Sequence, residues 1–376
     1  MVAPTRKKSE RLFGKEDGMK LILYRLVVIF SVVLLISAMH LTVCASEPGQ
    51  RVLKFANPFP STGVYPKIMQ WMASEITKRT NDKLKFEFYW SASLLPNQDQ
   101  VSGVGKGIAD IANVSSTFTQ TENPHWTTLS TGLASDLWVA VWASWDVLQN
   151  SPEIKAEMDK LNLVPTHGYT AGSNYWIFKN RLETLQDLKG KRIRTYGVKP
   201  TKIFQALGAT PVTIGPGEMY ESIERGVING AQGGLILGST FKLYEVAKYF
   251  AVPSPLKETL DITVVINKDV WKSFDQKTRD IINEVSREVN DRYVQAVMEE
   301  EQRLKKEMSA KYGVVFYDMS PEVQAAYIKA GEAFDTDWFN KWDSQGKKTR
   351  VVSEEIKKSV AKWEKVLKEK GYPWKR

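Results

Sequence analysis

Strand-like and helix-like segments alternate from residue 52 onward, and this order restricts the possible folds more than any other feature of the chain. Residues 52–60 begin as a short apolar β-type run, residues 64–80 carry apolar side chains four positions apart, and residues 85–90 alternate between apolar and polar side chains. Such β–α–β units form mostly parallel sheets covered by helices. The sequence therefore predicts an α/β fold.

A helix, a glycine and a strand follow one another twice. The first copy covers residues 97–116 with Gly107 after the helix, and the second covers residues 217–234 with Gly226 in the same place, about 120 positions later. Two lobes built on one plan are expected, because each copy is one unit of a helix-covered sheet.

The remaining segments predict how the lobes are joined. A helix-like stretch ends at Gly190 and a strand begins at Lys191, and residues 269–311 have helical character over nearly their whole length. Two further helices are predicted for residues 320–345 and 352–370. There is no low-complexity linker, so we expect strands or helices to connect the lobes.

The N-terminus has the pattern of a secretory signal peptide. Residues 26–39 are apolar except for two serines, and this run of 14 residues is shorter than a transmembrane helix of about 20. Small side chains predict cleavage after Ala45, so that residues 1–45 are removed. Cys44 leaves a lipoprotein signal as the alternative, and Met19 opens a better-proportioned signal peptide than Met1, so that residues 1–18 are a candidate over-extended start.

Charge and composition argue against several functions. The net charge is +9, but seven basic and three acidic residues before Ser46 supply +4 of it, and the other basic residues are interleaved with acids, which disfavours nucleic acid as a partner. After cleavage, His125 and His167 are the only histidines and no cysteine remains, which disfavours a zinc site or thiol chemistry. No phosphate loop or nucleophile elbow is present, so we expect no enzyme, although a carboxylate pair is left open.

Several motifs resemble one family of exported receptors, the substrate-binding proteins of TRAP (tripartite ATP-independent periplasmic) transporters of the C4-dicarboxylate-binding type, solute-binding protein family 7. The similar stretches are "SASLLP" (91–96), "GIADIA" (107–112), "LQDLKGKRIRT" (185–195), "ALGATPV" (206–212), "GEMYESIERGVINGAQ" (217–232) and "KLYEVAKYF" (242–250). Together with the N-terminal segment and the long helix, the resemblance covers nearly the whole exported chain.

The resemblance implies a two-lobed periplasmic-binding-protein-like fold, each lobe a mostly parallel sheet flanked by helices, with a long helix spanning both. Lobe 1 would comprise residues 46–172 and about 260–300, and lobe 2 residues 173–259 and about 301–376. It also implies a periplasmic, non-catalytic receptor that delivers an organic acid to the small and large membrane subunits of the transporter. No cofactor is implied, and a metal ion bridging ligand and protein is left open.

In this family the arginine that ends the "DLKG" signature pairs with the ligand's carboxylate, and the matching residue here is Arg194. A guanidinium offers a planar fork of donors to a carboxylate, and the pair is stronger in a closed cleft with little water. Lys191 and Arg192 are expected in solvent. The alternative for Arg194 is an exposed strand arginine.

The resemblance also indicates polar ligand contacts from both lobes. In lobe 1 these are Asn57, whose alternative role is that of a turn residue, and the pair Ser115 and Ser116 after the "GIADIA" strand. In lobe 2, Asn174 stands where some relatives have a second arginine.

After Gln232, the residue Gly233 stands where well-known members have an asparagine that contacts the ligand. One cation and one amide fewer predict a less polar ligand than a dicarboxylate or sugar acid, namely a monocarboxylate with an apolar or aromatic body.

Aromatic residues near these positions suit such a body: Phe59, Trp90, Tyr175, Trp176 and Tyr196. For each of them the alternative is a position in the hydrophobic core. Tyr196 is the best candidate for a ligand contact, because strand alternation puts it on the same face as Arg194. Two other functions stay open. One is an exported sensor subunit that presents an organic acid to a signalling partner, and the other is an exported enzyme acting on such acids.

Overall fold

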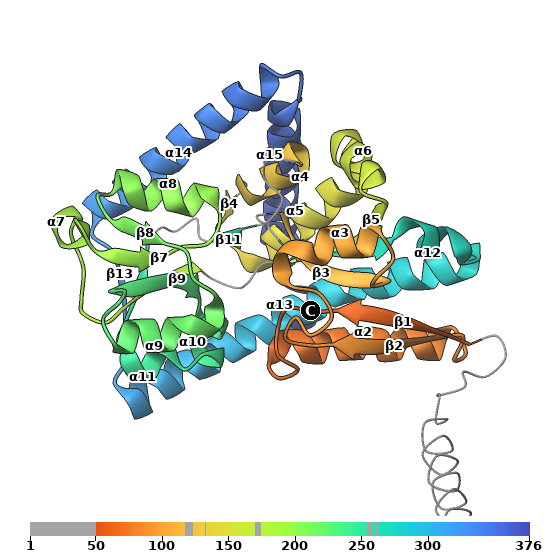
Figure 1. The fold of residues 1–376 in the computed structure, drawn as a ribbon, viewed down its shortest axis with the longest axis horizontal. Coiled ribbons are helices and arrows are strands. Elements are labelled where there is room, and N and C mark those ends of the chain that lie inside the picture. Colours follow the sequence, from red (N-terminus) through yellow and green to blue (C-terminus); the bar gives the residue numbers. More distant parts are fainter. Residues whose placement is uncertain (1–49, 117–122, 132, 170–173, 254–257, 260–261) are drawn as a thin grey trace, which may run out of the picture. The chain divides into compact units, whose positions relative to one another are not determined.

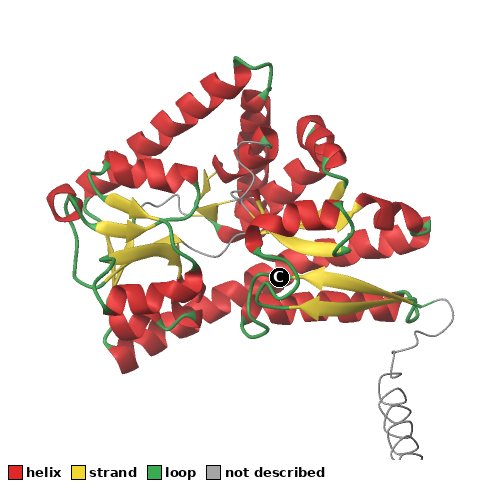
Figure 2. Ribbon diagram, viewed as in Figure 1, coloured by secondary structure: helices red, strands yellow, loops and turns green. Residues whose placement is uncertain are grey.

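The structure is a computed structural model that describes residues 50–116, 123–131, 133–169, 174–253, 258–259 and 262–376. The expected signal peptide lies outside these residues. Arg51–Arg376 form one compact unit, which carries two sheets with helices around them (Figures 1 and 2). No helix within the described ranges combines the length and the apolar character that crossing a membrane requires.

The first sheet has the strand order β2-β1-β3-β12-β5. Its strands are β1 (Arg51–Ala56), β2 (Leu84–Tyr89), β3 (Ile111–Ser115), β5 (Leu163–Tyr169) and β12 (Ile262–Asn267). Around it lie α2 (Val64–Arg79), α3 (Gln100–Gly105), α4 (Pro124–Thr128), α5 (Leu137–Asn150), α6 (Pro152–Lys160) and α12 (Lys268–Ser273). The β–α–β order expected for the N-terminal segment is confirmed; the helix and the second strand lie within one residue of their expected bounds, and the first strand ends four residues early, at Ala56.

The second sheet has the order β13-β10-β6-β9-β7-β8. Its strands are β6 (Asn174–Phe178), β7 (Arg192–Arg194), β8 (Thr210–Val212), β9 (Gly230–Gly234), β10 (Tyr249–Val252) and β13 (Val315–Asp318). The helices of this part are α7 (Leu185–Leu188), α8 (Val198–Ala206), α9 (Met219–Glu224), α10 (Leu235–Thr240) and α11 (Leu243–Val246). A separate two-stranded sheet joins β4 (Leu133–Ala134) to β11 (Glu258–Thr259).

Both sheets are mostly parallel, as expected, and each contains one antiparallel strand. In the first, β12 runs antiparallel to β3 and β5, and in the second, β6 runs antiparallel to β9 and β10. The physical reason is the route of the chain. β6 follows β5, and β12 follows β10, by passing from one sheet to the other, so each new strand enters at the edge where its neighbours end.

A single helix of 37 residues, α13 (Gln276–Tyr312), packs against both sheets' helices and confirms the expected long helix (Figure 1). At 1.5 Å per residue it is about 55 Å long. The Asp275 side chain accepts a hydrogen bond from the Thr278 amide at its start, and Gly313 ends it with a φ of +66°. Its first half contacts α2 and its last part contacts α11 and β13.

The two C-terminal helices pack against different sheets' helices. α14 (Pro321–Asp343) packs on α8 beside the second sheet, whereas α15 (Thr349–Lys370) packs on α5 beside the first. Val352 and Ile356 of α15 are buried in the core of the first sheet. This packing argues against the expected place of α15 in lobe 2, and the lobe boundaries stay a proposal.

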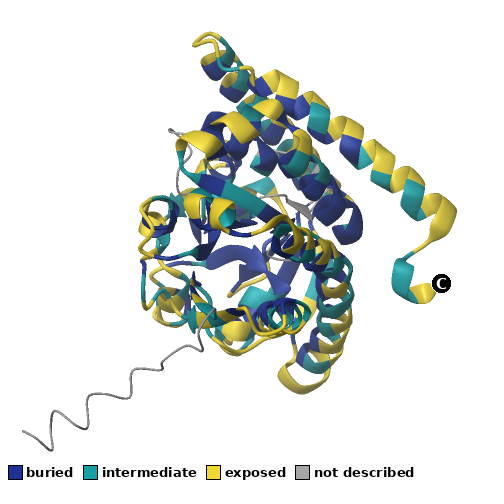
Figure 3. Cartoon of the chain, turned by 90° about the vertical axis from the view of Figure 1, so that its right-hand side faces the viewer, coloured by how far each residue is buried: buried dark blue, intermediate teal, exposed yellow. Residues whose placement is uncertain are grey.

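The central strands β3, β12, β6 and β9 consist almost entirely of buried residues, whereas β1 and β2 expose Lys54, Lys85 and Glu87 on one face (Figure 3). In β6 the alternation is complete: Tyr175 and Ile177 join one core cluster, and Trp176 and Phe178 join another on the opposite face. A strand that is apolar on both faces lies inside a sheet covered on both sides, which leaves the strand ends as the places where polar groups gather.

Candidate ligand-binding site

The chain itself ties the carboxyl ends of the two sheets together. β5 ends at Tyr169 on the edge where β3 ends, because Ile262 pairs with both Ser115 and Tyr169. The next strand begins at Asn174, which pairs with Gly234 at the end of β9. Five residue steps separate Tyr169 from Asn174, and such a segment spans at most about 18 Å. Ligands of open α/β sheets bind outside the carboxyl ends of strands, so this region is the candidate site.

Arg194 ends β7 at this edge and is 6% exposed. Its Nε donates to the Ile214 carbonyl at 3.3 Å and its Nη1 to the Gln232 carbonyl at 3.1 Å. The ring centre of Tyr196, a half-buried residue, lies 5.4 Å from the guanidinium carbon. Burial lowers the pKa of Arg194 from its ordinary value, and Tyr196 opposes this shift.

Within the described residues, no carboxylate forms an ion pair with Arg194. Lys199, a buried cation of α8, differs in having an acid partner, since its Nζ lies 2.9 Å from Asp335. A buried charge with only neutral carbonyls as partners is costly to desolvate, and an incoming anion would compensate it. Arg194 is therefore a buried cation without a described counter-charge, and its pairing with a ligand carboxylate stays a prediction.

Gln232 meets Arg194 through its backbone. Ala231 of β9 pairs with Arg194, so Arg194, Ala231 and Gly233 share one face of the sheet and the side chain of Gln232 points to the other. The carbonyl of Gln232 holds the guanidinium, and a ligand contact by its side chain stays a prediction.

Asn174 and Gln232 are diagonal neighbours on that other face. Both are buried, and Asn174 hydrogen-bonds to the Tyr327 hydroxyl. Asn174 Oδ1 and Gln232 Oε1 have no hydrogen-bond partner among the residues that the structure describes. Two buried amide oxygens without donors are costly, so this face has unused polar capacity.

Gly233 and Tyr175 pair with each other and lie on the Arg194 face. Tyr175 is 1% exposed and packs against Phe250 and Phe316, in the core rather than at a surface. A Cβ at Gly233 would lie 2.6 Å from Leu237 Cδ2, so the Leu237 side chain occupies the space beside this glycine. The core packing of Tyr175 weakens its case as a ligand contact.

The first sheet's edge carries a chain of hydrogen bonds. Asn57 is fully buried, and its Oδ1 accepts from the Phe59 amide at 3.0 Å while its Nδ2 donates to the Tyr65 hydroxyl at 3.5 Å. Tyr65 and Tyr169 stack at 4.6 Å and hydrogen-bond to each other, and the Tyr169 hydroxyl donates to Asn113 Oδ1 at 2.5 Å. Burial raises the pKa of both tyrosines. The side chain of Asn57 thus stabilises the turn after β1, and a ligand contact by it stays a prediction.

The other predicted residues of lobe 1 lie at the same edge. Ser115 ends β3, and the next residue, Ser116, is buried with its carbonyl accepting from Thr127 Oγ1 at 3.3 Å. Trp90 follows β2 and stacks on Phe88 at 4.7 Å. Ligand contacts by these residues stay predictions.

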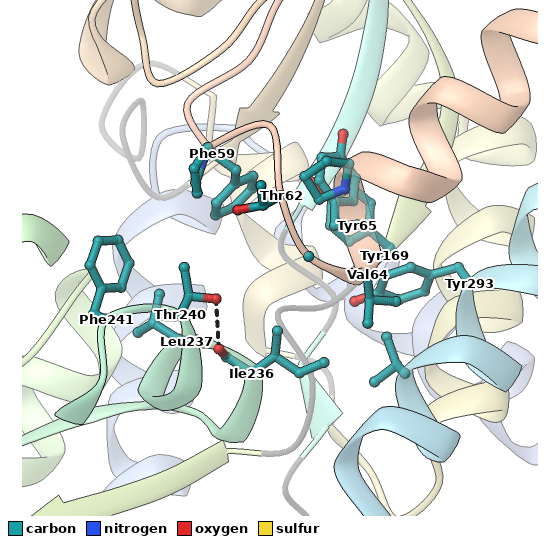
Figure 4. Close-up of a pocket in the computed structure, with 14 residues that line it drawn as sticks. Phe59, Thr62, Val64, Tyr65, Tyr169, Ile236, Leu237, Thr240, Phe241 and Tyr293 are labelled. Carbon is teal, nitrogen blue, oxygen red and sulfur yellow. Dashed lines mark hydrogen bonds between the residues drawn. The ribbon is translucent and has the colours of Figure 1, made fainter. Parts of the chain in front are cut away.

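A pocket between the two sheets' edges encloses about 580 Å³ of space not filled by atoms, part of it open solvent. Phe59, Tyr65 and Tyr169 line it on the first sheet's side, and the other side is lined by Ile236, Leu237 and Thr240 of α10 and by Phe241 directly after it (Figure 4). Tyr293 and Val297 of α13 complete the wall. The lining is mostly apolar, as the walls of small-ligand sites generally are.

Of the predicted residues, only Phe59 lines this pocket; Arg194 does not, although α10 follows directly on β9, the strand beside it. Sequence reasoning missed Tyr65, Tyr169 and Leu237. For Tyr169 the sequence contained a signal, because this residue lies only five positions before the predicted ligand contact Asn174. Among described residues no cluster of three or more His, Cys, Asp or Glu side chains is placed to hold a metal ion.

A sequence profile of the family "bacterial extracellular solute-binding protein, family 7" matches residues 59–341. The first three curated relatives are 22–27% identical, and the chain spans about three fifths of their length. One of them, a solute-binding protein of Sulfitobacter sp. (strain NAS-14.1), is 27% identical over 54% of this chain and 62% of its own.

Solved structures share the fold. A TRAP periplasmic solute-binding protein from Desulfovibrio salexigens has a TM-score of 0.73 at 22% identity, covering 85% of this chain and 97% of its own. An extracytoplasmic solute receptor from Bordetella pertussis that binds pyroglutamic acid has 0.71 at 18% identity, covering 83% and 99%. A TRAP protein from Bradyrhizobium sp. in complex with galacturonate has 0.69 at 19% identity, covering 83% and 100%. These matches confirm the two-lobed α/β fold.

Proposed function

The chain belongs to the bacterial extracellular solute-binding proteins of family 7, and from this premise we propose that it is the receptor of a TRAP transporter that binds an organic acid. The acid enters between the two sheets, its carboxylate pairs with Arg194, and the protein delivers it to the small and large membrane subunits. The receptor is exported to the periplasm after cleavage behind Ala45, and it changes no bond of its ligand.

The observation that carries the proposal is the buried guanidinium of Arg194, which has two carbonyl partners and no acid partner in the described part of the chain. A carboxylate neutralises it and forms charge-assisted hydrogen bonds that are stronger than those to a neutral carbonyl. The Bordetella and Bradyrhizobium proteins of the same fold bind acids, which supports this class of ligand.

The finer proposal is a monocarboxylate with an apolar or aromatic body. The pocket wall supports it, because aromatic and aliphatic side chains make up most of the lining on both sides (Figure 4). Arg194 lies on the same face of the second sheet as Gly233 and the α10 residues that follow it. A carboxylate at Arg194 would therefore have its body directed along this face.

A thermal-shift screen over mono- and dicarboxylates, followed by calorimetry, tests the proposal, because a ligand that binds only the folded protein raises its melting temperature. The Arg194→Ala variant should lose the bound acid, and Arg194→Lys should lose most of the affinity because an ammonium lacks the planar fork. Unchanged affinity in Arg194→Ala would refute the assignment. Ligand recovered intact after incubation separates a receptor from an enzyme.

A further inference from the structure

Three hydroxyls of the pocket wall, those of Tyr65, Tyr169 and Thr240, already donate within the protein. Tyr65 accepts from Asn57 and hydrogen-bonds to Tyr169, and Tyr169 donates to Asn113. The Thr240 hydroxyl donates to the Ile236 carbonyl of its own helix at 2.9 Å (Figure 4). Because the hydrogens of these hydroxyls are already donated, a ligand hydroxyl buried against this wall would leave water without gaining a donor from them.

Gly233 and Leu237 shape the other wall together. Leu237 lines the pocket and is half-buried, and its Cδ2 occupies the position 2.6 Å from where a Cβ of residue 233 would stand. The φ angle of Gly233 lies outside the left-handed region, so the backbone itself does not require glycine. What requires glycine is the space taken by Leu237.

We propose that the site binds acids with an apolar body more tightly than polyhydroxylated acids. Gly233 determines this preference, because the absence of a side chain at this position leaves space for Leu237, which forms the apolar wall. This inference rests on the proposed receptor function and names its substrate class. Gly233 is a positioning residue, since it acts through Leu237.

The size of the selection follows from the chemistry. Each buried ligand hydroxyl without a partner lowers affinity roughly ten- to a hundredfold. Each buried methylene of an apolar body raises affinity roughly fourfold. Binding in this pocket should therefore lower the affinity for a sugar acid with several hydroxyls and raise the affinity for an aryl or branched acid.

The test compares three probes by calorimetry: acetate, phenylacetate and galacturonate. We expect wild-type protein to bind phenylacetate at least about tenfold more tightly than galacturonate. In Gly233→Ala the new methyl pushes Leu237 toward the pocket, so affinity for phenylacetate should fall about five- to tenfold while that for acetate, which has no body to accommodate, stays within about twofold.

A double-mutant cycle isolates the pair. In the Leu237→Ala background the methyl at residue 233 meets only the Cβ of residue 237, 3.8 Å away, so Gly233→Ala should change phenylacetate affinity by less than about twofold there. Ile328→Ala, at an exposed apolar residue of α14 outside the pocket, is the control and should leave all three affinities unchanged. Melting temperatures check that each variant is folded.

Two results overturn the proposal: equal losses from Gly233→Ala in both backgrounds, or a wild-type protein that binds none of the probes or prefers galacturonate. The receptor function is judged separately. If galacturonate is preferred but lost in Arg194→Ala, the selection is wrong and the function stands, whereas binding that persists in Arg194→Ala refutes the function itself.

Discussion

The carboxyl edges of the two sheets handle their polar groups in opposite ways. At the first edge, Asn57, Tyr65, Tyr169 and Asn113 satisfy one another in a continuous series of hydrogen bonds. At the second, Arg194 is buried with two carbonyls as its partners and no acid within the described residues. Apart from Asn113 Nδ2, which has no partner among the described residues, the groups of the first edge pair with one another, whereas the second edge holds a buried cation without a described acid partner.

On the proposed function, this difference separates residues that stabilise the protein from the arginine that pairs with its ligand. Groups that satisfy one another contribute to the free energy of unfolding, and removing one leaves its partner buried and unsatisfied. A buried cation without a counter-charge lowers stability in the free protein and contributes only when an anion arrives. The two edges should therefore respond to substitution in different measurements.

The largest expected effect belongs to Arg194→Met. Acid affinity should fall at least about 100-fold, because the charge-assisted pair is lost. The free energy of unfolding of the free protein should stay the same or rise by about 1 kcal/mol, since an apolar side chain replaces an uncompensated buried charge. Calorimetry with the acid and urea denaturation without it measure the two quantities.

Lys199→Met is the matched control, the same substitution at a buried cation that has a partner. It leaves the Asp335 carboxylate, whose pKa burial already raises, without its ammonium. Unfolding free energy should therefore fall by about 1–3 kcal/mol. If both variants destabilise the free protein equally, the distinction between the two cations fails.

Tyr169→Phe probes the first edge and should affect stability more than binding. Without the hydroxyl, Asn113 Oδ1 is left buried without its donor, so the free energy of unfolding should fall by about 1–3 kcal/mol in urea denaturation. Acid affinity should change less than about fivefold, since the ring that lines the pocket remains. An affinity loss as large as that of Arg194→Met would mean that this edge holds the ligand.

The smallest effect concerns the attachment of α13 to α2. Arg79 donates to both carboxylate oxygens of Glu288 at 2.6 and 2.8 Å, and this pair lowers the pKa of Glu288 from 4.5. Solvent screens the pair, so Glu288→Gln should cost about 0.5–1 kcal/mol at neutral pH with no change in acid affinity.

The pH dependence of that cost has a definite sign. A carboxyl whose pKa is lowered in the folded state stabilises it above the unfolded value of 4.5 and loses this contribution as the pH falls through the lowered pKa. The stability difference between wild type and Glu288→Gln should vanish in urea denaturation curves recorded below that range. A difference that persists at low pH would point to packing instead of charge.

Local patterns in the sequence were sufficient for most elements. The spacing of Ile68, Met72 and Ile76 predicted α2, the alternation from Lys85 to Trp90 predicted β2, and Gly107, with a φ of +76°, followed α3 as expected. These succeed because helix and strand periodicity and glycine's freedom at positive φ are properties of neighbouring residues.

Other features depend on contacts between distant residues. The sequence did not indicate that β12 and β6 enter their sheets antiparallel, that α15 packs on α5, or that Tyr65 and Tyr169 stack. A helix pattern says which face is apolar and not which partner covers it. For the same reason the sequence did not indicate that the Leu237 side chain packs beside Gly233.

By itself, the sequence determined the class of fold and the order of its elements. Through the family motif it also identified Arg194 as the candidate partner of a ligand carboxylate. Only the tertiary structure decided that Arg194 is buried against carbonyls while Lys199 has its acid, and that an apolar pocket lies between the sheet edges. The physical reason is that burial and pairing of a charge are set by groups far away along the chain, which local patterns do not encode.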